Sequence, residues 1–319
     1  MRGTDNPSMH LIIAFASVLS AAGRQSLQTL ALPNLASLVA RLAPQALDAG
    51  DEYSLTPPHE REHARALGLE GADGALPWAA HCAAAHGIDT DDLAWGRITP
   101  VHWRVGASEI SLVDPAQLAL AEDESRALLE ALHPLFESEG FVLRYGTPLA
   151  WYAAHESLDG LRSASLDRVI GRRIDPWLAP LENARRVRRL QNEVQMLLHE
   201  HPVNEAREAR GLPVVNSFWL SGCGVHQPVR SGAEVHLERA LRAPALGEDW
   251  AAWIEAWQAL DRGLLAEALQ GLRRGEPLSL SLCGERHAQR FETRTTPWLT
   301  RLGQRWGRAP ALQPLLEPL

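Results

Sequence analysis

The sequence contains no lysine: all 31 of its basic residues are arginine. Without a lysine amine the chain has neither a Schiff-base nucleophile nor the phosphate-binding lysine of a P-loop. Positive charge is also in deficit, because the formal net charge is −8 at pH 7. Proteins that bind nucleic-acid backbones usually present a basic face. We therefore expect no nucleic-acid partner.

Cysteine and long hydrophobic runs are scarce as well. The odd set of Cys82, Cys223 and Cys283 forms no disulfide framework and suits a reducing cytoplasm. The apolar stretch at residues 11–23 is too short to span a bilayer. Asp5 and His10 precede it where a signal peptide would carry positive charge. We expect a buried first strand, a cytoplasmic protein and no membrane partner.

The order of apolar segments predicts an α/β fold. Residues 9–16 form a continuous apolar run of the kind that central parallel strands show. Strands and helices alternate at both ends of the chain, and the last buried strand is expected at residues 277–283. We predict one domain over residues 1–319 with a mostly parallel central sheet flanked by helices. Residues 97–180 look antiparallel and are predicted to form a small α+β insertion.

Local patterns place several elements. Hairpins are expected at residues 101–113 and 141–153, on either side of a leucine-striped helix. Asn34 and Thr56 are expected to be the N-caps of two early helices. From residue 248 onward, tryptophans recur at helical spacing, which indicates a helix face in the core: Trp250, Trp253 and Trp257.

The most distinctive spacing lies in residues 201–224, HPVNEAREARGLPVVNSFWLSGCG. The stretch holds, in order, Asn204, Arg207, Gly211 and Asn216. A Gly-x-Gly turn follows at Gly222 and Gly224. This order resembles the central segment of the archaeal-type cofactor-independent phosphoglycerate mutases, members of the alkaline-phosphatase superfamily. Leu32-Pro33-Asn34-Leu35 after the first strand is similar to the opening of that family. The resemblance implies an alkaline-phosphatase-like fold.

The middle of the chain is more similar to a bacterial family of RpfE-type regulatory proteins, through Leu149-Ala150-Trp151-Tyr152 and residues 191–198. The chain departs from the active mutases at two strand ends. Where the resemblance implies a metal-binding Asp, the first strand ends in Ala14-Phe15-Ala16-Ser17, and the later Asp-His pair is replaced by Cys283-Gly284-Glu285-Arg286. A two-metal phosphoryl-transfer centre needs hard oxygen ligands. Ser17 and Ser20 are the hydroxyls that remain, or are simply small loop residues.

Two further constellations could bind metal. Cys223 with His226, and Cys283 with His287, each follow a buried strand, and together they could hold a soft ion such as zinc. The alternative is a pair of buried cysteines and a pair of surface histidines. His59-Glu60-Arg61-Glu62-His63 satisfies the H-E-x-x-H signature of zinc peptidases, but its charged spacers favour an exposed helix start.

Polar residues near the same strand ends are candidates for ligand binding: Asn204, Arg207, Asn216, Glu285 and Arg286. An arginine can hold an anion bidentately. The alternative is that the Asn and Arg side chains brace the helix–strand turn by bonding backbone groups.

The leading hypothesis is a phosphoglycerate-mutase-like protein of the regulatory type, catalytically degenerate, that binds a small anionic ligand or a protein partner. The alternatives are a divergent phosphomutase or hydrolase with a rebuilt metal site, and, with less support, a zinc peptidase.

Overall fold

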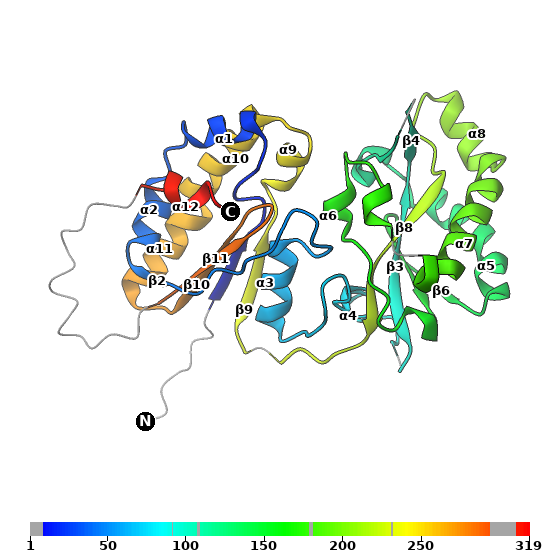
Figure 1. Cartoon of the computed structure of the whole chain (residues 1–319), viewed down its shortest axis with the longest axis horizontal. Coiled ribbons are helices and arrows are strands. Elements are labelled where there is room, and N and C mark those ends of the chain that lie inside the picture. The colour runs from blue at the N-terminus through cyan, green and yellow to red at the C-terminus, as the bar shows by residue number, and fades with distance from the viewer. Residues whose placement is uncertain (1–8, 91, 107–108, 179–180, 231, 294–310) are drawn as a thin grey trace. The chain divides into compact units, whose positions relative to one another are not determined.

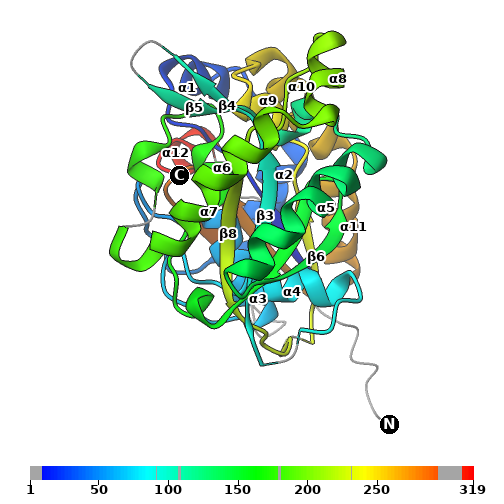
Figure 2. The ribbon, with the colours of Figure 1, turned by 90° about the vertical axis from the view of Figure 1, so that its right-hand side faces the viewer.

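The computed structural model describes residues 9–90, 92–106, 109–178, 181–230, 232–293 and 311–319, the side chains of 181–183 excepted. The chain forms two compact units (Figures 1 and 2). The first comprises Met1–Tyr53, Pro57–Gly68 and Val229–Leu319, and the second comprises Ser54–Thr56 and Leu69–Pro228. Residues 97–180 belong to the second unit, whose bounds are wider, and a separate insertion at 97–180 stays a prediction.

The first unit is built from both ends of the chain. Its strands are β1 (Met9–Ile13), β2 (Leu42–Pro44), β9 (Glu234–Glu238), β10 (Leu278–Cys283) and β11 (Ala288–Thr293). Its helices are α1 (Ala21–Leu27), α2 (Pro33–Val39), α3 (Pro58–Leu67), α9 (Arg242–Leu246), α10 (Trp250–Arg262), α11 (Leu264–Arg274) and α12 (Gln313–Leu316).

These strands form a mixed sheet in the order β2-β11-β10-β1-β9. β1 is parallel to β9 and to β10, whereas β11 is antiparallel to both β10 and β2. The expectation of a mostly parallel sheet is therefore wrong. A parallel pair needs a crossover, and the connection from β10 to β11 spans only residues 284–287, which is long enough for a hairpin alone.

The two faces of this sheet differ in character. Leu11 and Ile13 of β1 belong to the main apolar core, which includes the fully buried Trp253 and Trp257. The prediction that the tryptophan stripe is core is confirmed. α3 contacts β1, β9 and β10 on the other face, which carries His10 and Ile12. Figure 1 shows α3 on one side of the strands and α2 and α11 on the other.

An acidic side chain from α10 caps helix α2. Leu32 occupies the N-cap position and offers no side-chain hydrogen bond. Instead, the carboxylate of Asp261, which is 2% exposed, accepts hydrogen bonds from the backbone N–H of Leu35 at 2.8 Å and of Asn34 at 3.2 Å. The prediction that Asn34 is the cap is wrong, because its side-chain amide donates to the Asp261 carbonyl oxygen at 2.9 Å.

The second unit contains an antiparallel sheet and a short hairpin. Its strands are β3 (Ala94–Val101), β4 (Trp103–Val105), β5 (Ile110–Leu112), β6 (Val142–Thr147), β7 (Ala150–Ala154) and β8 (Ser217–Val225). Its α-helices are α4 (Trp78–Ala85), α5 (Glu122–Ser138), α6 (Leu166–Val169), α7 (Leu181–His199) and α8 (Pro202–Ala209). Short 3₁₀ turns occupy Pro115–Leu118, Glu156–Leu158 and Asp175–Trp177.

The order of the larger sheet is β6-β7-β3-β8, and β4 pairs with β5. Both predicted hairpins are confirmed, as β4–β5 and β6–β7. Leucines of α5 and α7 pack with Ile98 and Phe218 on one face, and alanines of α4 pack with Trp95 and Tyr152 on the other. Figure 2 shows α5 and α7 on the viewer's side of β3 and β8.

Thr56 has a different role from the one predicted. Pro57 is the N-cap residue of α3, and Pro58 is the first helical residue. The Thr56 hydroxyl instead accepts a hydrogen bond from the backbone N–H of Gly74 at 2.8 Å, within the second unit. A threonine before two prolines thus joins two segments of a loop rather than starting the helix.

Within the described part of the chain, each helix is too short or too polar to cross a bilayer.

Replacing Asp261 with alanine is expected to lower the free energy of unfolding by about 1–2 kcal/mol, because α2 loses its buried N-cap acceptor. Chemical denaturation followed by circular dichroism measures the effect. Glu255→Ala, an exposed change on the same helix, is the control and should stay within about 0.5 kcal/mol of the parent. Equal losses in both variants would show that the long-range cap contributes nothing.

Candidate functional site

The carboxyl ends of β1 and β10 meet at one edge of the sheet in the first unit. The backbone N–H of Ala16 donates to the carbonyl of Cys283 at 2.8 Å, and that of Ala14 donates to the carbonyl of Glu238 at 3.1 Å. Open α/β sheets bind ligands at the carboxyl ends of their strands. The two strand ends singled out in the sequence therefore lie together.

The loop after β1 is held in an unfavourable backbone conformation. Phe15 has a φ of 57°, in the left-handed region that residues other than glycine rarely adopt. The indole N–H of Trp253 donates to the Phe15 carbonyl at 3.1 Å, and the ring of His59 lies 5.2 Å from the Phe15 ring, centroid to centroid. Surrounding packing thus fixes this turn.

The two candidate hydroxyls of this loop differ. Ser20 is the N-cap of α1, and its hydroxyl accepts a hydrogen bond from the backbone N–H of Gly23 at 3.1 Å. Ser17 is 1% exposed, and its buried hydroxyl has no hydrogen-bond partner among the described residues. A buried hydroxyl that forms no hydrogen bond is costly in free energy. Of the two serines, Ser17 is therefore the one whose hydroxyl can still form a hydrogen bond.

Glu285 and Arg286 follow β10 and lie in the same region. A carboxylate oxygen of Glu285 accepts a hydrogen bond from the backbone N–H of Leu19 at 2.9 Å, which ties the β1 loop to β10. The carbonyl of Arg286 accepts from the guanidinium of Arg61 at 3.2 Å, and the Arg286 backbone N–H donates to the carbonyl of Leu319. The Nε atom of Arg286 is buried without a hydrogen-bond partner among the described residues.

Cys283 and His287 are poorly prepared to bind metal as they stand. Burial, together with the charge of Asp48, raises the pKa of the Cys283 thiol, so the thiolate that a metal needs is disfavoured. The His287 Nδ1 atom accepts a hydrogen bond from the backbone N–H of Gly50 at 3.1 Å. This bond uses the lone pair of the neutral ring, and burial lowers the pKa of His287.

The other two metal candidates belong to the second unit. Cys223 is fully buried in β8, where burial raises its pKa to about 12, and the Ser163 hydroxyl donates to its sulfur at 3.8 Å. The described residues of either unit taken alone contain no group of three or more His, Cys, Asp or Glu side chains arranged to share an ion. A site formed by Cys223, His226, Cys283 and His287 stays a prediction.

Asn204 and Asn216 form hydrogen bonds with the backbone. The Asn204 amide donates to the carbonyls of Leu198 and Val215, and its oxygen accepts from the Val215 N–H at 3.0 Å. The Asn216 side chain exchanges two hydrogen bonds with the backbone of Trp103, at 2.7 and 2.9 Å. Such bonds to backbone groups are those expected if the asparagines brace the helix–strand turn. Ligand binding by either residue stays a prediction.

Arg207 is a buried cation in a closed network. Its side chain is 0% exposed, and its Nε donates to the carbonyl of Pro213 at 2.9 Å. The remaining guanidinium nitrogens bond the carbonyl of Leu118 and the carboxylate of Glu124. Arg210 pairs with the same carboxylate, and these contacts lower the pKa of Glu124 against the effect of its partial burial. The guanidinium is thus committed to holding α8 on α5.

A polar relay on the α3 face of the first sheet was not found by sequence reasoning. The Nε2 atom of His10 lies 2.9 Å from the hydroxyl of Ser281, which donates to a carboxylate oxygen of Glu62 at 2.8 Å. All three side chains are at most 6% exposed. The signal in the sequence was the alternation of Leu and Ser in β10, LSLSLC, which places its serines on one face.

The direction of the hydrogen bonds in this relay excludes activation of Ser281 by a histidine base. Glu62 also forms an ion pair with Arg65, so its carboxylate accepts the hydrogen bond that the Ser281 hydroxyl donates. Ser281 must then accept from His10, whose neutral ring carries its proton on Nε2. A histidine base would instead accept from the serine. The relay is therefore a buried hydrogen-bond network rather than an activated nucleophile.

The H-E-x-x-H segment does not form an exposed helix start. His59 is 2% exposed and Glu62 is 1% exposed, because both face the sheet from the first turns of α3. The expectation of a solvated surface here is wrong. Arg61 and Arg65 of the same helix pair with Asp48 at 2.8 and 3.2 Å.

Comparisons with known proteins find distant structural likeness only. No family model matches the chain, and no curated protein matches its sequence. The chain is similar to the PH0037 protein from Pyrococcus horikoshii, with 12% identity and a TM-score of 0.44 over 90% of this chain and 87% of that one. It is also similar to a cofactor-independent phosphoglycerate mutase from Thermoplasma acidophilum, with 13% identity and a TM-score of 0.37 over 90% and 89%. TM-scores below 0.5 do not establish a common fold.

Replacing Arg207 with glutamine is expected to lower the free energy of unfolding by about 3 kcal/mol, because the buried carbonyl and carboxylate partners lose their cation. Arg210→Gln is the matched control: it removes the other partner of Glu124, but its side chain is 54% exposed. That change should cost less than about 1 kcal/mol. Urea denaturation of both variants measures the difference, and similar costs would contradict the assignment of Arg207 as the buried brace.

Burial, with the nearby charges of Arg290 and Arg65, lowers the pKa of His10 from 6.5 to about 4. The folded chain therefore binds this proton more weakly than the unfolded chain. The associated stability is complete above pH 6.5 and is lost as the pH falls from 6.5 toward 4. The difference between the two pKa values corresponds to about 3 kcal/mol.

His10→Gln keeps a donor to Ser281 but cannot titrate, so its free energy of unfolding should fall less steeply over this pH range. Urea denaturation at several pH values measures the slope. His199→Gln, an exposed change, should retain the parent slope. The same slope in His10→Gln and in the parent would refute the assignment.

Proposed function

We propose that this chain is a phosphoglycerate-mutase-like protein of the regulatory type, which binds a small anionic ligand or a protein partner and transfers no phosphoryl group by the two-metal route. The family assignment rests on the residues at 201–224 and on the opening of the chain. An alkaline-phosphatase-like arrangement of residues 1–319, and a relation to the RpfE-type proteins, are part of the same proposal.

The observation that carries the proposal is the chemistry of the joined ends of β1 and β10. Residues 14–16 offer alanine and phenylalanine side chains, and the Phe15 turn is closed by Trp253 and His59. The thiol of Cys283 is kept protonated by burial. A two-metal centre requires carboxylate or similar oxygen ligands on both ions. Beside these strand ends, the buried Nε of Arg286 and the hydroxyl of Ser17 keep hydrogen-bonding capacity for an anion.

A second candidate is a divergent phosphomutase or hydrolase, and the state of Ser17 favours it. A buried hydroxyl without a hydrogen-bond partner in the described ranges, two residues after a strained turn, has the features of a nucleophile position. Such an enzyme would use a metal site rebuilt from other residues. The two candidates differ in whether Ser17 breaks a phosphate ester or only lines a binding site.

A cytoplasmic location completes the proposal. Cys82, Cys223 and Cys283 are all free thiols, as a reducing compartment would keep them.

The test is a phosphatase and phosphoglycerate isomerisation assay with added manganese, zinc or cobalt, combined with calorimetric titration of 3-phosphoglycerate. We expect no turnover with any metal and measurable binding. Binding should weaken at least tenfold in Arg286→Gln and remain unchanged in Arg262→Gln, an exposed change on α10.

Turnover that disappears in Ser17→Ala and persists in Ser20→Ala would overturn the proposal in favour of the hydrolytic alternative. Absence of both turnover and binding would contradict the part of the proposal that places an anionic ligand of this class at the strand ends.

A further inference from the structure

Residues 311–319 meet the short hairpin that follows β10 in the first unit. The carbonyl of Leu319 accepts hydrogen bonds from two successive backbone N–H groups, those of Arg286 at 2.9 Å and of His287 at 3.0 Å. Successive N–H groups of a turn that converge on one point form a concave donor pair of the kind that binds anions. Here an oxygen from another part of the same chain occupies that pair.

Gly284 makes room for Leu319 at this hairpin. A Cβ atom added at residue 284 would lie 2.4 Å from the carbonyl carbon of Leu319 and 2.5 Å from its oxygen. Non-bonded carbon atoms pack about 3.5–4.0 Å apart, so any larger residue would exclude Leu319 from this position. The φ of Gly284 lies outside the left-handed region, so close approach rather than backbone conformation is what requires glycine here.

Two leucines anchor the segment. Leu316 and Leu319 are 2% and 1% exposed and belong to the main apolar core of the first unit. The helix between them and residue 312, α12, has four residues, and a helix this short is not stable without packing. The hold of the segment on the hairpin therefore depends on a small number of contacts, which is the situation in which local unfolding is easiest.

Bonds other than those to Leu319 fix the hairpin itself. The backbone N–H of Gly284 donates to the carbonyl of His287 at 3.0 Å, and the hairpin closes the antiparallel pair of β10 and β11. The guanidinium of Arg61 donates to the carbonyl of Arg286 at 3.2 Å. The two N–H donors are therefore preorganised, and loss of the Leu319 oxygen leaves both in need of an acceptor.

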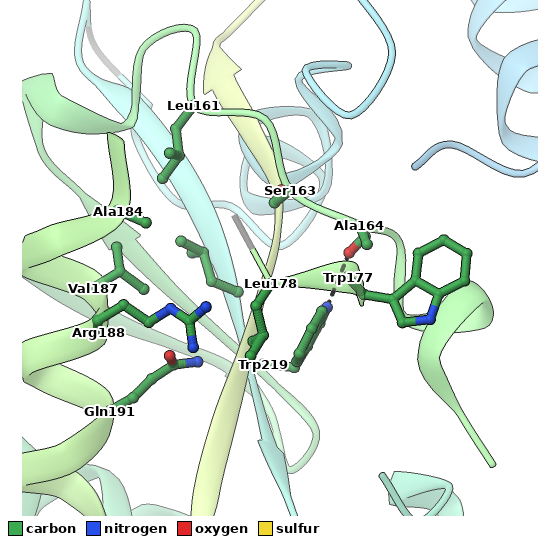
Figure 3. Close-up of a pocket in the computed structure, with 11 residues that line it drawn as sticks. Leu161, Ser163, Ala164, Trp177, Leu178, Ala184, Val187, Arg188, Gln191 and Trp219 are labelled. Carbon is green, nitrogen blue, oxygen red and sulfur yellow. Dashed lines mark hydrogen bonds between the residues drawn. The ribbon is translucent and has the colours of Figure 1, made fainter. Parts of the chain in front are cut away.

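Hydrogen bonds around a hollow in the second unit are of a different kind (Figure 3). The indole N–H of Trp219 donates to the carbonyl of Ala164 at 2.9 Å, and the Gln191 amide donates to the carbonyl of Phe218 at 3.2 Å. Both donors are side chains at most 5% exposed, so neither bond opens without unpacking its side chain. At the hairpin the donors are backbone groups, which stay in place when their acceptor leaves.

We propose that residues 311–319 form an autoinhibitory contact: the Leu319 carbonyl occupies the N–H pair of Arg286 and His287, and release of the segment opens this pair to an anionic group such as phosphate. The pair adjoins the Arg286 side chain at the end of β10. The inference rests on the proposed function, because it describes how the same strand-end site is regulated. One acceptor at a time can use the pair, so the segment and the ligand exclude each other.

The test is Leu316→Ala in the full chain, which weakens the anchor without altering the hairpin. Hydrogen exchange of the Arg286 and His287 amides should become about tenfold faster, whereas the amides of β1 should keep their protection. Calorimetric titration with inorganic phosphate should show about fivefold tighter binding than in the parent, because a larger fraction of the molecules is open. Glu317→Ala, an exposed change in the same segment, is the matched control and should alter neither.

A second change tests whether phosphate uses the same position as Leu319. Gly284→Ala, added to Leu316→Ala, places a methyl group where the Leu319 oxygen lies, so the gain in phosphate affinity should disappear. Leu319→Ala is an independent way to release the segment, and it should reproduce the gain if Leu316→Ala unfolds the first unit.

The inference is overturned if the Arg286 and His287 amides lose protection while phosphate affinity stays at the parent value, or if Glu317→Ala gives the same gain. It is also overturned if the amides remain protected in both leucine variants, since the segment is then not released with its anchors. Tighter phosphate binding in Leu316→Ala, without binding of 3-phosphoglycerate by any variant, would support the autoinhibitory contact and contradict the proposed function instead.

Discussion

Strand β1 runs between β9 and β10 and is parallel to both, although those two strands belong to the last third of the sequence. Both neighbours must therefore be present before the first residues of the sheet can complete their hydrogen bonds. Closing a loop of this length costs entropy, but the cost grows only slowly with the number of residues enclosed. The second unit occupies most of that loop, so its residues are able to form their own core.

Completion of the sheet also brings the functional candidates of the first unit together. The loop that carries Ser17 follows β1, and Glu285 and Arg286 follow β10. The parallel pairing places these two strand ends at one edge, and the bond from Leu19 to Glu285 joins them. On the face contacted by α3, the same pairing positions His10 two residues out of register with Ser281 and within hydrogen-bond distance of it. The parallel pairing of β1 with β10 thus positions both the polar relay and the candidate site.

A buried arginine joins two helices of the second unit in this lysine-free chain. Arg207 is enclosed by acceptors and joins α8 to α5, so it contributes to stability through partners that would otherwise be buried without a donor. The hydrogen-bond acceptors around this guanidinium are what make its burial compatible with a stable fold.

Period and composition determined much of the local structure: the buried first strand, the two hairpins, the leucine-striped α5 and the tryptophan face of α10. These depend on contacts within a few residues, which the sequence displays directly. Only the tertiary structure decided the mixed sheet, because strand direction depends on which segments pair. It also decided that Asp261 rather than Asn34 caps α2, and that Arg207 is enclosed by acceptors. Those outcomes depend on contacts between residues that are far apart along the chain, and local sequence patterns do not determine which of these residues meet.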